Sequence, residues 1–370
     1  MHLQCAAVGF APQFALLRLA QPRYGAAHKS HEQGVVHQMK LLAPAAAAVA
    51  LVMGASAASA QDIEPAVVFD MGGKFDRSFN EGIFNGVERF RAASGIAYME
   101  FEVTNEAQRE QALRRMAENG ATDVIAVGFA QAPAVQVVAA EFPDVRFTII
   151  DSVVDLPNVR SVVFKEQEGS FLVGMLAAMA SETGAVGFVG GMDIPLIRAF
   201  GCGYAQGAMF VDADVEVFQN MTGTTPAAWN DPGRGGELAR SQFDRGADVV
   251  YAAAGGTGVG VYQAAEDTGN LAVGVDSNQN YLHPGTMLTS MLKRVDVAAE
   301  NAFADAAAGT WEAGVLNLGL AEEGVGYALD EFNWELMTPE MVNAVTSATI
   351  GILNGDIEVV DYRAAGECPV

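Results

Sequence analysis

The chain has 370 residues, which is enough for two domains or one large one, and its 51% hydrophobic content excludes an intrinsically disordered protein. The 45 acidic against 21 basic residues give a net charge of -24, which opposes binding to nucleic acid or to an anionic membrane. Three cysteines exclude a disulfide scaffold or a Cys-rich zinc module, and four of the five histidines precede residue 38, so we expect no metal site and no other cofactor.

The first element predicted along the chain is an export signal at residues 39–60. Lys40 supplies a positive flank, residues 41–53 form an apolar centre, and Ala58-Ser59-Ala60 offers the small residues that a signal peptidase requires. The apolar centre spans 13 residues, fewer than the roughly 20 of a transmembrane helix, although an N-terminal membrane anchor is the alternative. Residues 1–38 show no clear periodicity and end just before Met39, which indicates a translation start assigned too far upstream.

The residues beside the predicted cleavage site indicate where the mature protein resides and whether it carries a lipid anchor. They include no cysteine, so we expect residues 61–370 to form a freely soluble periplasmic protein without a lipid or membrane anchor. Cys202 and Cys368 are then the only thiols of the mature chain, and an oxidising compartment favours their pairing if the fold brings them together. Two free thiols are the alternative.

From residue 66 onward, short apolar runs alternate with longer amphipathic stretches, a pattern typical of parallel strands connected by helices. Strands are predicted at residues 66–71, 97–103, 123–127, 146–151, 185–189, 214–219, 248–252 and 271–275, and further elements of unassigned type at 285–291, 325–329 and 339–354. Helices are predicted at residues 78–95, with Ser78 as N-cap, and at 106–119, 131–141, 166–181, 232–245 and 295–308. The sequence thus predicts the α/β class with doubly wound parallel sheets.

The strand-helix series restarts at residues 184–191, where an apolar strand ends in a glycine turn. We therefore expect two similar lobes joined by several crossing segments, which would act as a hinge. The first lobe is placed at about 65–175 plus about 280–315, and the second at about 176–279 plus about 316–365. Two independent tandem domains are the alternative, although no Pro/Ser-rich linker separates them.

Ligands of open parallel sheets bind beyond the carboxyl ends of the strands, where helix N-termini also point. The residues predicted at that edge combine carboxylates, an amide and glycines, which favours a neutral polyhydroxylated ligand over a phosphate. They are Asp70-Met71-Gly72-Gly73, Gly128-Phe129, Asp151-Ser152, Gly190-Gly191-Met192-Asp193, Gly255-Gly256-Thr257-Gly258 and Asp276-Ser277-Asn278.

Two aromatic residues, Phe79 and Phe200, are predicted on the same set of loops. A planar base held between their rings would gain roughly 1 to 3 kcal/mol per stacking contact. Asp70 and Asn80 could hydrogen-bond the edge of that base, and the carboxylate of Asp276 could accept from two adjacent ribose hydroxyls. Core packing for each phenylalanine and a helix cap for Asp276 are the alternatives.

The segment from Val68 to Asn80, with Asp70, Asp76 and Ser78-Phe79-Asn80, resembles the D-x-x-x-x-x-D-x-S-F-N opening of the BMP family. Members of this family are substrate-binding proteins of ABC importers and include purine nucleoside receptors. Further matches follow in order over nearly the whole mature chain: Gly128-Phe129, Ile150-Asp151, Glu168-Gly169-Ser170-Phe171-Leu172-Val173-Gly174, Val189-Gly190-Gly191, Gly246-Ala247-Asp248-Val249, Gly274-Val275-Asp276-Ser277-Asn278-Gln279 and Thr289-Ser290-Met291-Leu292-Lys293.

This resemblance implies a type I periplasmic-binding fold whose two lobes close around the ligand. The roles that it implies are base stacking by Phe79 and Phe200, bonding of the base edge by Asp70 and Asn80, and holding of the ribose by Asp276 and Lys293 with Gly255 nearby. The sequence departs from the family at two points. Asn278 replaces an acidic residue, which puts hydroxyl selectivity in question, and the lipobox cysteine is missing.

Together these features predict a monomeric receptor without enzymatic activity. It would close on a nucleoside, with a purine favoured, and hand it to a permease driven by an ATPase. A receptor of the same fold for a sugar or another heterocycle is the nearest alternative, followed by a nucleotide-dependent enzyme using the glycines of residues 255–260. A DNA-binding repressor with the same bilobed core is disfavoured, because it would need a basic helix-turn-helix segment at its front. A sensory receptor that binds the same ligand is a further alternative to transport.

Overall fold

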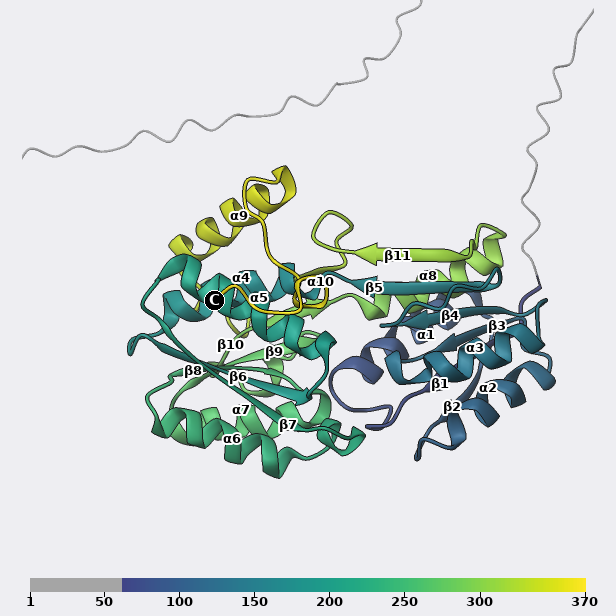
Figure 1. Cartoon of the computed structure of the whole chain (residues 1–370), viewed down its shortest axis with the longest axis horizontal. Coiled ribbons are helices and arrows are strands. Elements are labelled where there is room, and N and C mark those ends of the chain that lie inside the picture. Colours follow the sequence, from purple (N-terminus) through teal and green to yellow (C-terminus); the bar gives the residue numbers. More distant parts are fainter. Residues whose placement is uncertain (1–61) are drawn as a thin grey trace, which may run out of the picture. The chain divides into compact units, whose positions relative to one another are not determined.

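The computed structural model describes residues 62–370, which form two six-stranded sheets with helices packed on both faces (Figure 1). The predicted α/β class is confirmed. The predicted export signal at residues 39–60 and the segment before it lie outside the described residues. Within residues 62–370, no helix combines the length and the apolar character needed to cross a bilayer.

The first sheet contains only parallel pairs, in the order β11-β5-β4-β3-β1-β2. Its strands are β1 (Pro65–Phe69), β2 (Met99–Glu102), β3 (Asp123–Ala126), β4 (Arg146–Ile150), β5 (Val159–Phe164) and β11 (Gly314–Leu318). Its helices are α1 (Phe79–Ser94), α2 (Gln108–Glu118), α3 (Ala132–Glu141) and α8 (Val295–Ala308). Val67 and Phe69 belong to the core under α1 and α8, whereas Ala66 and Val68 belong to the core under α2 and α3. Burial on both faces explains the uninterrupted apolar run of β1.

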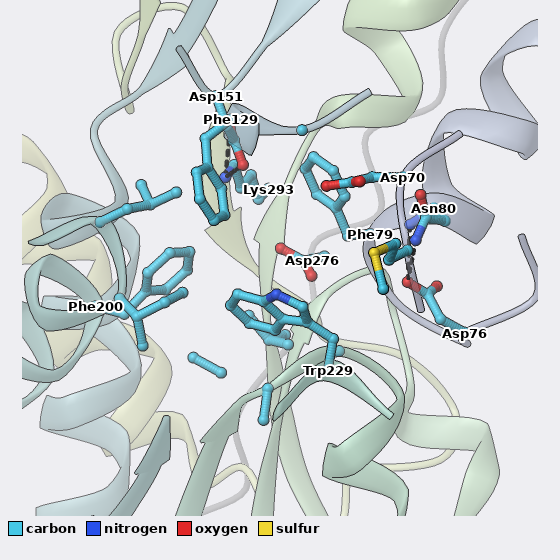
Figure 2. Close-up of a pocket in the computed structure, with 18 residues that line it drawn as sticks. Asp70, Asp76, Phe79, Asn80, Phe129, Asp151, Phe200, Trp229, Asp276 and Lys293 are labelled. Carbon is cyan, nitrogen blue, oxygen red and sulfur yellow. Dashed lines mark hydrogen bonds and ion pairs between the residues drawn. The ribbon is translucent and has the colours of Figure 1, made fainter. Parts of the chain in front are cut away.

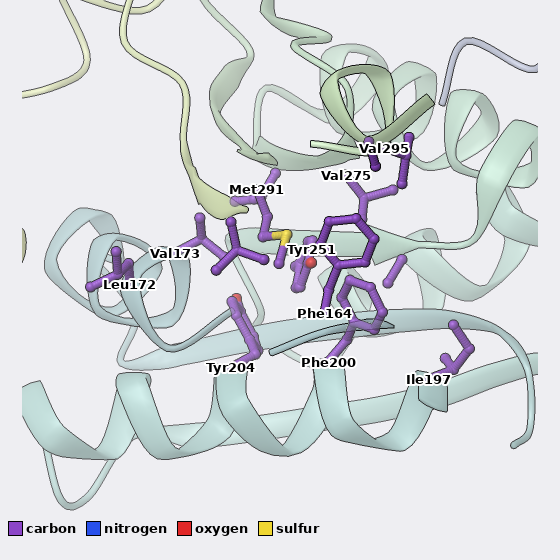
Figure 3. Packing of buried hydrophobic residues seen from close by; sticks show 14 of the residues in the cluster. Phe164, Leu172, Val173, Ile197, Phe200, Tyr204, Tyr251, Val275, Met291 and Val295 are labelled. Atoms are coloured by element: carbon purple, nitrogen blue, oxygen red, sulfur yellow. The ribbon is translucent and has the colours of Figure 1, made fainter. Parts of the chain in front are cut away.

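The second sheet has the order β12-β10-β9-β8-β6-β7 and is parallel except for β12, which runs antiparallel to β10. Its strands are β6 (Ala185–Met192), β7 (Glu216–Gly223), β8 (Val249–Ala253), β9 (Leu271–Asp276), β10 (Met287–Lys293) and β12 (Val325–Tyr327). Helices α4 (Glu166–Ala180) and α5 (Pro195–Val211) pack on one face, and α6 (Pro232–Asp244) and α7 (Gly258–Thr268) on the other. On the first of these faces, Tyr204 of α5 packs against Tyr251 of β8, with Phe200 nearby (Figure 3).

The chain passes between the two sheets three times. β5 leads into α4 at Lys165, β10 leads into α8 at Arg294, and β11 leads into β12 through residues 319–324. The predicted boundaries assign residues 280–315 to the first lobe, whereas β10 pairs with β9 in the second sheet, and only α8 and β11 return to the first. The predicted first lobe also includes residues 166–175, but α4 packs on α5 and β10. Sequence periodicity marks an element without showing its neighbour in the sheet, which explains both differences.

Close approach of α4 and α5 depends on glycines. A side chain at Gly203 would meet the carbonyl oxygen of Gln167, and one at Gly207 would meet that of Phe171. The two helices therefore pack backbone to backbone, and this contact fixes the position of Phe200 one turn before Gly203.

The C-terminal segment packs on both α4 and α5. It contains α9 (Pro339–Asn354) and the short α10 (Tyr362–Ala365). Cys368 forms a disulfide with Cys202 of α5, and the side chain of Gln206 holds the backbone of Val360 through two hydrogen bonds of 2.9 Å. The sequence left the pairing of the two cysteines open, and the structure joins them because α10 packs on α5.

Candidate functional site

A cavity of about 620 Å³, including its open mouth, lies where strands of both sheets end. The strands are β1, β3 and β4 of the first sheet and β8, β9 and β10 of the second. The structure brings all the sequence-predicted ligand-binding residues to this cavity (Figure 2): Asp70, Phe79, Asn80, Phe200, Gly255, Asp276 and Lys293. Their roles in binding stay predictions, but their common location is what the predicted cleft requires.

Asp76 shapes the loop that brings α1 to the cavity. Its carboxylate accepts hydrogen bonds from the backbone N–H groups of Ser78, Asn80 and Glu81, at 2.8, 3.0 and 3.1 Å. Burial raises the pKa of Asp76, although these hydrogen bonds work in the opposite direction. Ser78 occupies the N-cap position of α1, as predicted, although its hydroxyl makes no capping hydrogen bond. Asp76 satisfies the free N–H groups of this helix end instead.

Asn80, at the second position of α1, is buried and only partly satisfied. Its Nδ2 group donates to Asp76 at 3.1 Å, whereas its Oδ1 atom has no hydrogen-bond partner within the described residues. A buried carbonyl oxygen without a partner is costly, typically by about 1 to 3 kcal/mol. A ligand N–H in the cavity would satisfy it.

Asp70, directly after β1, forms an ion pair with Arg109 of α2 at 3.2 Å. Burial raises the pKa of Asp70, and the charge of Arg109 partly offsets this effect. Gly128 lies against the carboxylate with a φ of +94°, and a Cβ atom there would come within 2.9 Å of Asp70 Oδ2. Only glycine therefore lets the two loops approach this closely.

Asp276, at the end of β9, has a left-handed backbone conformation with a φ of 64°. Strained residues of this kind are concentrated at functional sites. The hydroxyl of Ser78 donates to its carboxylate at 2.5 Å, and Ser277 donates back to the Ser78 carbonyl at 3.0 Å. Burial raises the pKa of Asp276 to about 6, while Lys293 and Ser78 act in the opposite direction. These bonds connect the two lobes beside the cavity.

Lys293, at the end of β10, is 2% exposed and sits among carboxylates and aromatic rings. Its Nζ atom lies 2.7 Å from Asp151 and 3.1 Å from Glu166. Burial raises the pKa of both carboxyl groups, with Lys293 opposing the shift. Burial alone would lower the pKa of Lys293, but the surrounding carboxylates raise it overall. The ammonium is therefore charged and pairs with two buried carboxylates of the protein.

The aromatic residues of the cavity come from both lobes. The ring centroids of Phe79 and Phe200 lie 5.3 and 5.5 Å from Lys293 Nζ. Phe200 lies inside α5, not on a loop as predicted, since Pro195 begins a helix that the sequence analysis did not identify. Trp229, at the end of the turn Pro226–Trp229, was missed altogether and also faces the cavity (Figure 2). A tryptophan shortly after a proline in a loop beyond a strand was the available signal.

Two further predicted positions differ in their relation to the cavity. Gly255 lines it with a φ of +57°, beside the backbone of Trp229. Asn278 does not line it, because its side-chain amide donates to Asp330 at 2.5 Å on an exposed loop. The replacement at Asn278 therefore leaves the lining of the cavity unchanged.

The charge of the site restricts the ligand. Four carboxylates, those of Asp70, Asp76, Asp151 and Asp276, line the cavity with Lys293 as the single lining cation. Like charges close together in a buried site repel strongly, so a phosphate or another anion would be opposed. Across residues 62–370, no group of three His, Cys, Asp or Glu side chains is placed to hold a metal ion.

Comparison with known proteins agrees with this geometry. Residues 63–359 match the family model Bmp, described as ABC transporter substrate-binding protein PnrA-like. A lipoprotein of Pyrococcus abyssi is 34% identical over 72% of this chain and 69% of its own length. The ABC transporter nucleoside-binding protein BmpA of Lactococcus lactis is 29% identical over 83% of this chain and 91% of its own length.

Solved structures support the fold. An ABC transporter solute-binding protein from Aeropyrum pernix superposes with a TM-score of 0.75 at 28% identity, over 81% of this chain and 94% of its own. The predicted fold of ABC solute-binding proteins is thus confirmed.

One prediction is overturned by the comparison. The relatives from Pyrococcus abyssi, Pyrococcus horikoshii and Pyrococcus furiosus are all named as lipoproteins. The expectation of a freely soluble periplasmic protein without a lipid anchor is therefore wrong. It rested on the absence of a cysteine beside the predicted cleavage site, and such an absence carries no conclusion about how a member of this group is attached.

Proposed function

The chain belongs to the Bmp family of ABC transporter substrate-binding proteins, and from this premise we propose that it binds a nucleoside, with a purine favoured, and delivers it to a permease. It does so as a monomer and without catalysing a reaction. The nucleoside-binding relative from Lactococcus lactis supports the choice of ligand. The resemblance noted in the sequence supports the assignment of roles to individual residues.

The main support is that Phe79 and Phe200, from opposite lobes, line one cavity together with carboxylates and an unsatisfied amide oxygen. The base would lie between the two rings, each stacking contact contributing roughly 1 to 3 kcal/mol. The buried Oδ1 atom of Asn80 and the carboxylate of Asp70 would accept hydrogen bonds from N–H groups of the base. A heterocycle with several donors along one edge suits these acceptors.

The ribose would occupy the part of the cavity beside Asp276. The two carboxylate oxygens there can accept from adjacent hydroxyl groups, and Ser78 already donates to one of them. Because the cavity carries more carboxylates than cations, an uncharged nucleoside is favoured over its phosphorylated forms. The alternative ligand, a sugar alone, would leave the two phenylalanines and Trp229 without a flat partner.

The test is isothermal titration calorimetry of Phe79→Ala with a panel of purine and pyrimidine nucleosides. Loss of one stacking contact should weaken binding by roughly 1 to 3 kcal/mol, or about 5- to 150-fold in Kd. Phe75→Ala is the matched control, because Phe75 lies four residues earlier, is 63% exposed and does not line the cavity. Equal affinity of the Phe79 variant and the parent protein would contradict the stacking role, and a panel without any binding would contradict the function itself.

A further inference from the structure

The indole N–H of Trp229 is a hydrogen-bond donor that the protein itself does not use. Trp229 lines the ligand cavity, and no group within residues 62–370 accepts a hydrogen bond from its Nε1 atom. The chain has two other tryptophans. Trp311 donates its N–H to the hydroxyl of Thr148 at 3.2 Å, and Trp334 is 61% exposed, so water can satisfy its N–H. Because tryptophan N–H groups away from bulk water usually find a partner, the donor of Trp229 calls for one inside the cavity.

The indole ring is fixed in place by its own lobe. A Cβ atom at Gly191 would collide with Cζ3 of the ring, so the six-membered ring lies directly on the backbone of β6. Residue Ala228, just before the tryptophan, is buried, and its carbonyl oxygen accepts hydrogen bonds from Thr257 at 2.8 Å and Thr222 at 3.1 Å. The ring atoms nearest Gly191 are Cζ3 and Cε3, on the edge opposite Nε1. The N–H is thus held away from β6 before any ligand arrives.

Asp276 offers an acceptor that is also unused. The hydroxyl of Ser78 donates to Oδ2 at 2.5 Å, whereas Oδ1 accepts no hydrogen bond from the part of the chain that the structure describes. Asp276 and Trp229 line the same cavity, and in Figure 2 the indole nitrogen is turned toward the carboxylate. The structure of residues 62–370 contains no hydrogen bond between these two side chains. A ligand atom between them would face a donor on one side and an acceptor on the other.

This pair of protein groups selects the chemistry of that ligand atom. An indole N–H can only donate, and an ionised carboxylate can only accept. A ring nitrogen or carbonyl oxygen of a base would accept from Trp229 but present a lone pair to Asp276, and a base N–H would present a hydrogen to Trp229. A hydroxyl group satisfies both, because it donates its hydrogen to the carboxylate and accepts from the indole. In a nucleoside the hydroxyl groups are on the sugar.

We infer, resting on the proposed function, that Trp229 determines specificity for the sugar: its indole N–H and Oδ1 of Asp276 hold one ribose hydroxyl between them. A nucleoside without that hydroxyl leaves a donor and an acceptor of the cavity unpaired, which costs affinity. The site therefore discriminates a ribonucleoside from one of its deoxy forms through a residue of the second lobe, in addition to the carboxylate itself.

Isothermal titration calorimetry of the parent protein and Trp229→Phe at pH 8 tests this inference. The ligands are adenosine or guanosine, whichever binds more tightly, and its 2′-, 3′- and 5′-deoxy forms. Phenylalanine keeps a flat apolar ring but has no N–H, so the variant should bind the ribonucleoside about 3- to 10-fold more weakly. One of the deoxy compounds should lose at least about threefold less through the substitution, because the hydroxyl that Trp229 would contact is already missing. The other two should lose as much as the ribonucleoside.

Trp334→Phe is the control, since Trp334 is exposed and does not line the cavity. It should leave the Kd of all four ligands within about twofold. Binding of the selected deoxy compound to Trp229→Phe also shows that this variant is folded.

The inference is overturned if Trp229→Phe binds the ribonucleoside as tightly as the parent protein does. It is also overturned if the substitution weakens the ribonucleoside and all three deoxy compounds by the same factor, because the ring would then act by packing alone. Both results leave the proposed function intact. Absence of binding of either purine nucleoside to the parent protein removes the proposed function together with this inference, so the two failures are told apart.

Discussion

The cavity has two charged ends, and they are built differently. At the outer end a single ion pair joins Asp70 to Arg109, both from the first lobe, beside a second cavity. At the inner end Lys293 contacts Asp151 and Glu166, which lie at the ends of β4 and β5, and Glu166 also contacts Arg363 at 2.8 Å. The outer pair is local, whereas the inner cluster combines two crossings between the lobes with the C-terminal segment.

This difference indicates separate tasks. Arg109 contacts the Asp70 carboxylate through its Oδ1 atom, so the carboxylate can also accept a hydrogen bond from a ligand at the base edge. The inner cluster contains three buried carboxylates, counting Asp276, and each of its charges depends on the others. Removal of Lys293 leaves the buried carboxylates of Asp151 and Glu166 without their cation. The inner end should therefore respond more strongly to substitution than the outer end.

Lys293→Met should have the largest effect. It keeps most of the side-chain volume but leaves Asp151 and Glu166 without their common cation, and breaking a buried pair in this way costs about 3 to 5 kcal/mol in the free energy of unfolding. Urea unfolding followed by circular dichroism measures this difference. Lys165→Met is the control, because Lys165 is 35% exposed and its pair with Glu168 should contribute at most about 1 kcal/mol. Similar losses in the free energy of unfolding for Lys293→Met and Lys165→Met would show that the inner cluster contributes no more to stability than a surface ion pair.

Asp276→Asn should raise the free energy of unfolding above about pH 6 and weaken nucleoside binding. Burial raises the pKa of Asp276 from 3.8 to about 6, so between these values the folded state holds a proton that the unfolded state releases. The free energy of unfolding therefore falls as pH rises through this range, by about 3 kcal/mol. Asparagine removes this contribution, so the variant should be more stable than the parent protein above about pH 6.

Ligand binding should show the reverse dependence. The charged carboxylate of Asp276 accepts the ribose hydroxyls best, so nucleoside affinity of the parent protein should fall as pH drops below about 6. At pH 8 the asparagine variant should unfold at higher urea and bind more weakly. The exposed Asp144→Asn is the control and should change neither quantity. A variant that loses stability at pH 8 would show that the charge of Asp276 stabilises the empty protein.

The sequence predicted the parts of this molecule that depend on local pattern. Helix α8 matches its predicted residue range, because apolar periodicity and a terminal glycine mark it. The range of α9 was predicted as an element, but its type was not. Strands β5 and β11 were missed. β11 is mostly exposed, so its residues lack the apolar run that marks a buried strand, and its place beside β5 depends on a long-range pairing.

The site shows the same limit. The motif around Asp70 and Phe79 could be found because its residues are adjacent in sequence and follow one strand. The pairing of Lys293 with Asp151 could not, because 142 residues separate them and only the ends of β4 and β10 bring them together. Trp229 escaped notice for a similar reason, since nothing near it in the sequence shows that its turn reaches the cavity.

Arg363→Met gives the smallest of these effects and tests whether the C-terminal segment belongs to the inner end. The guanidinium of Arg363 donates to the carbonyl of Phe164 at 3.0 Å and pairs with Glu166, and the disulfide to Cys202 holds this segment on α5. Its side chain is 27% exposed, so water can replace part of the contact, and we expect a loss of about 1 to 3 kcal/mol in the free energy of unfolding.

The matched control for Arg363 is Arg198→Met. Arg198 also lies beside α10, but its side chain is 46% exposed and its pair with Asp193 should contribute at most about 1 kcal/mol. Burial raises the pKa of Glu166 and the charge of Arg363 opposes this shift, so removal of Arg363 should also make nucleoside binding more dependent on pH, whereas Arg198→Met should leave the pH profile unchanged. A parallel pH profile for both variants would mean that the C-terminal segment supports the fold alone and that the inner end consists only of Lys293 and its three carboxylates.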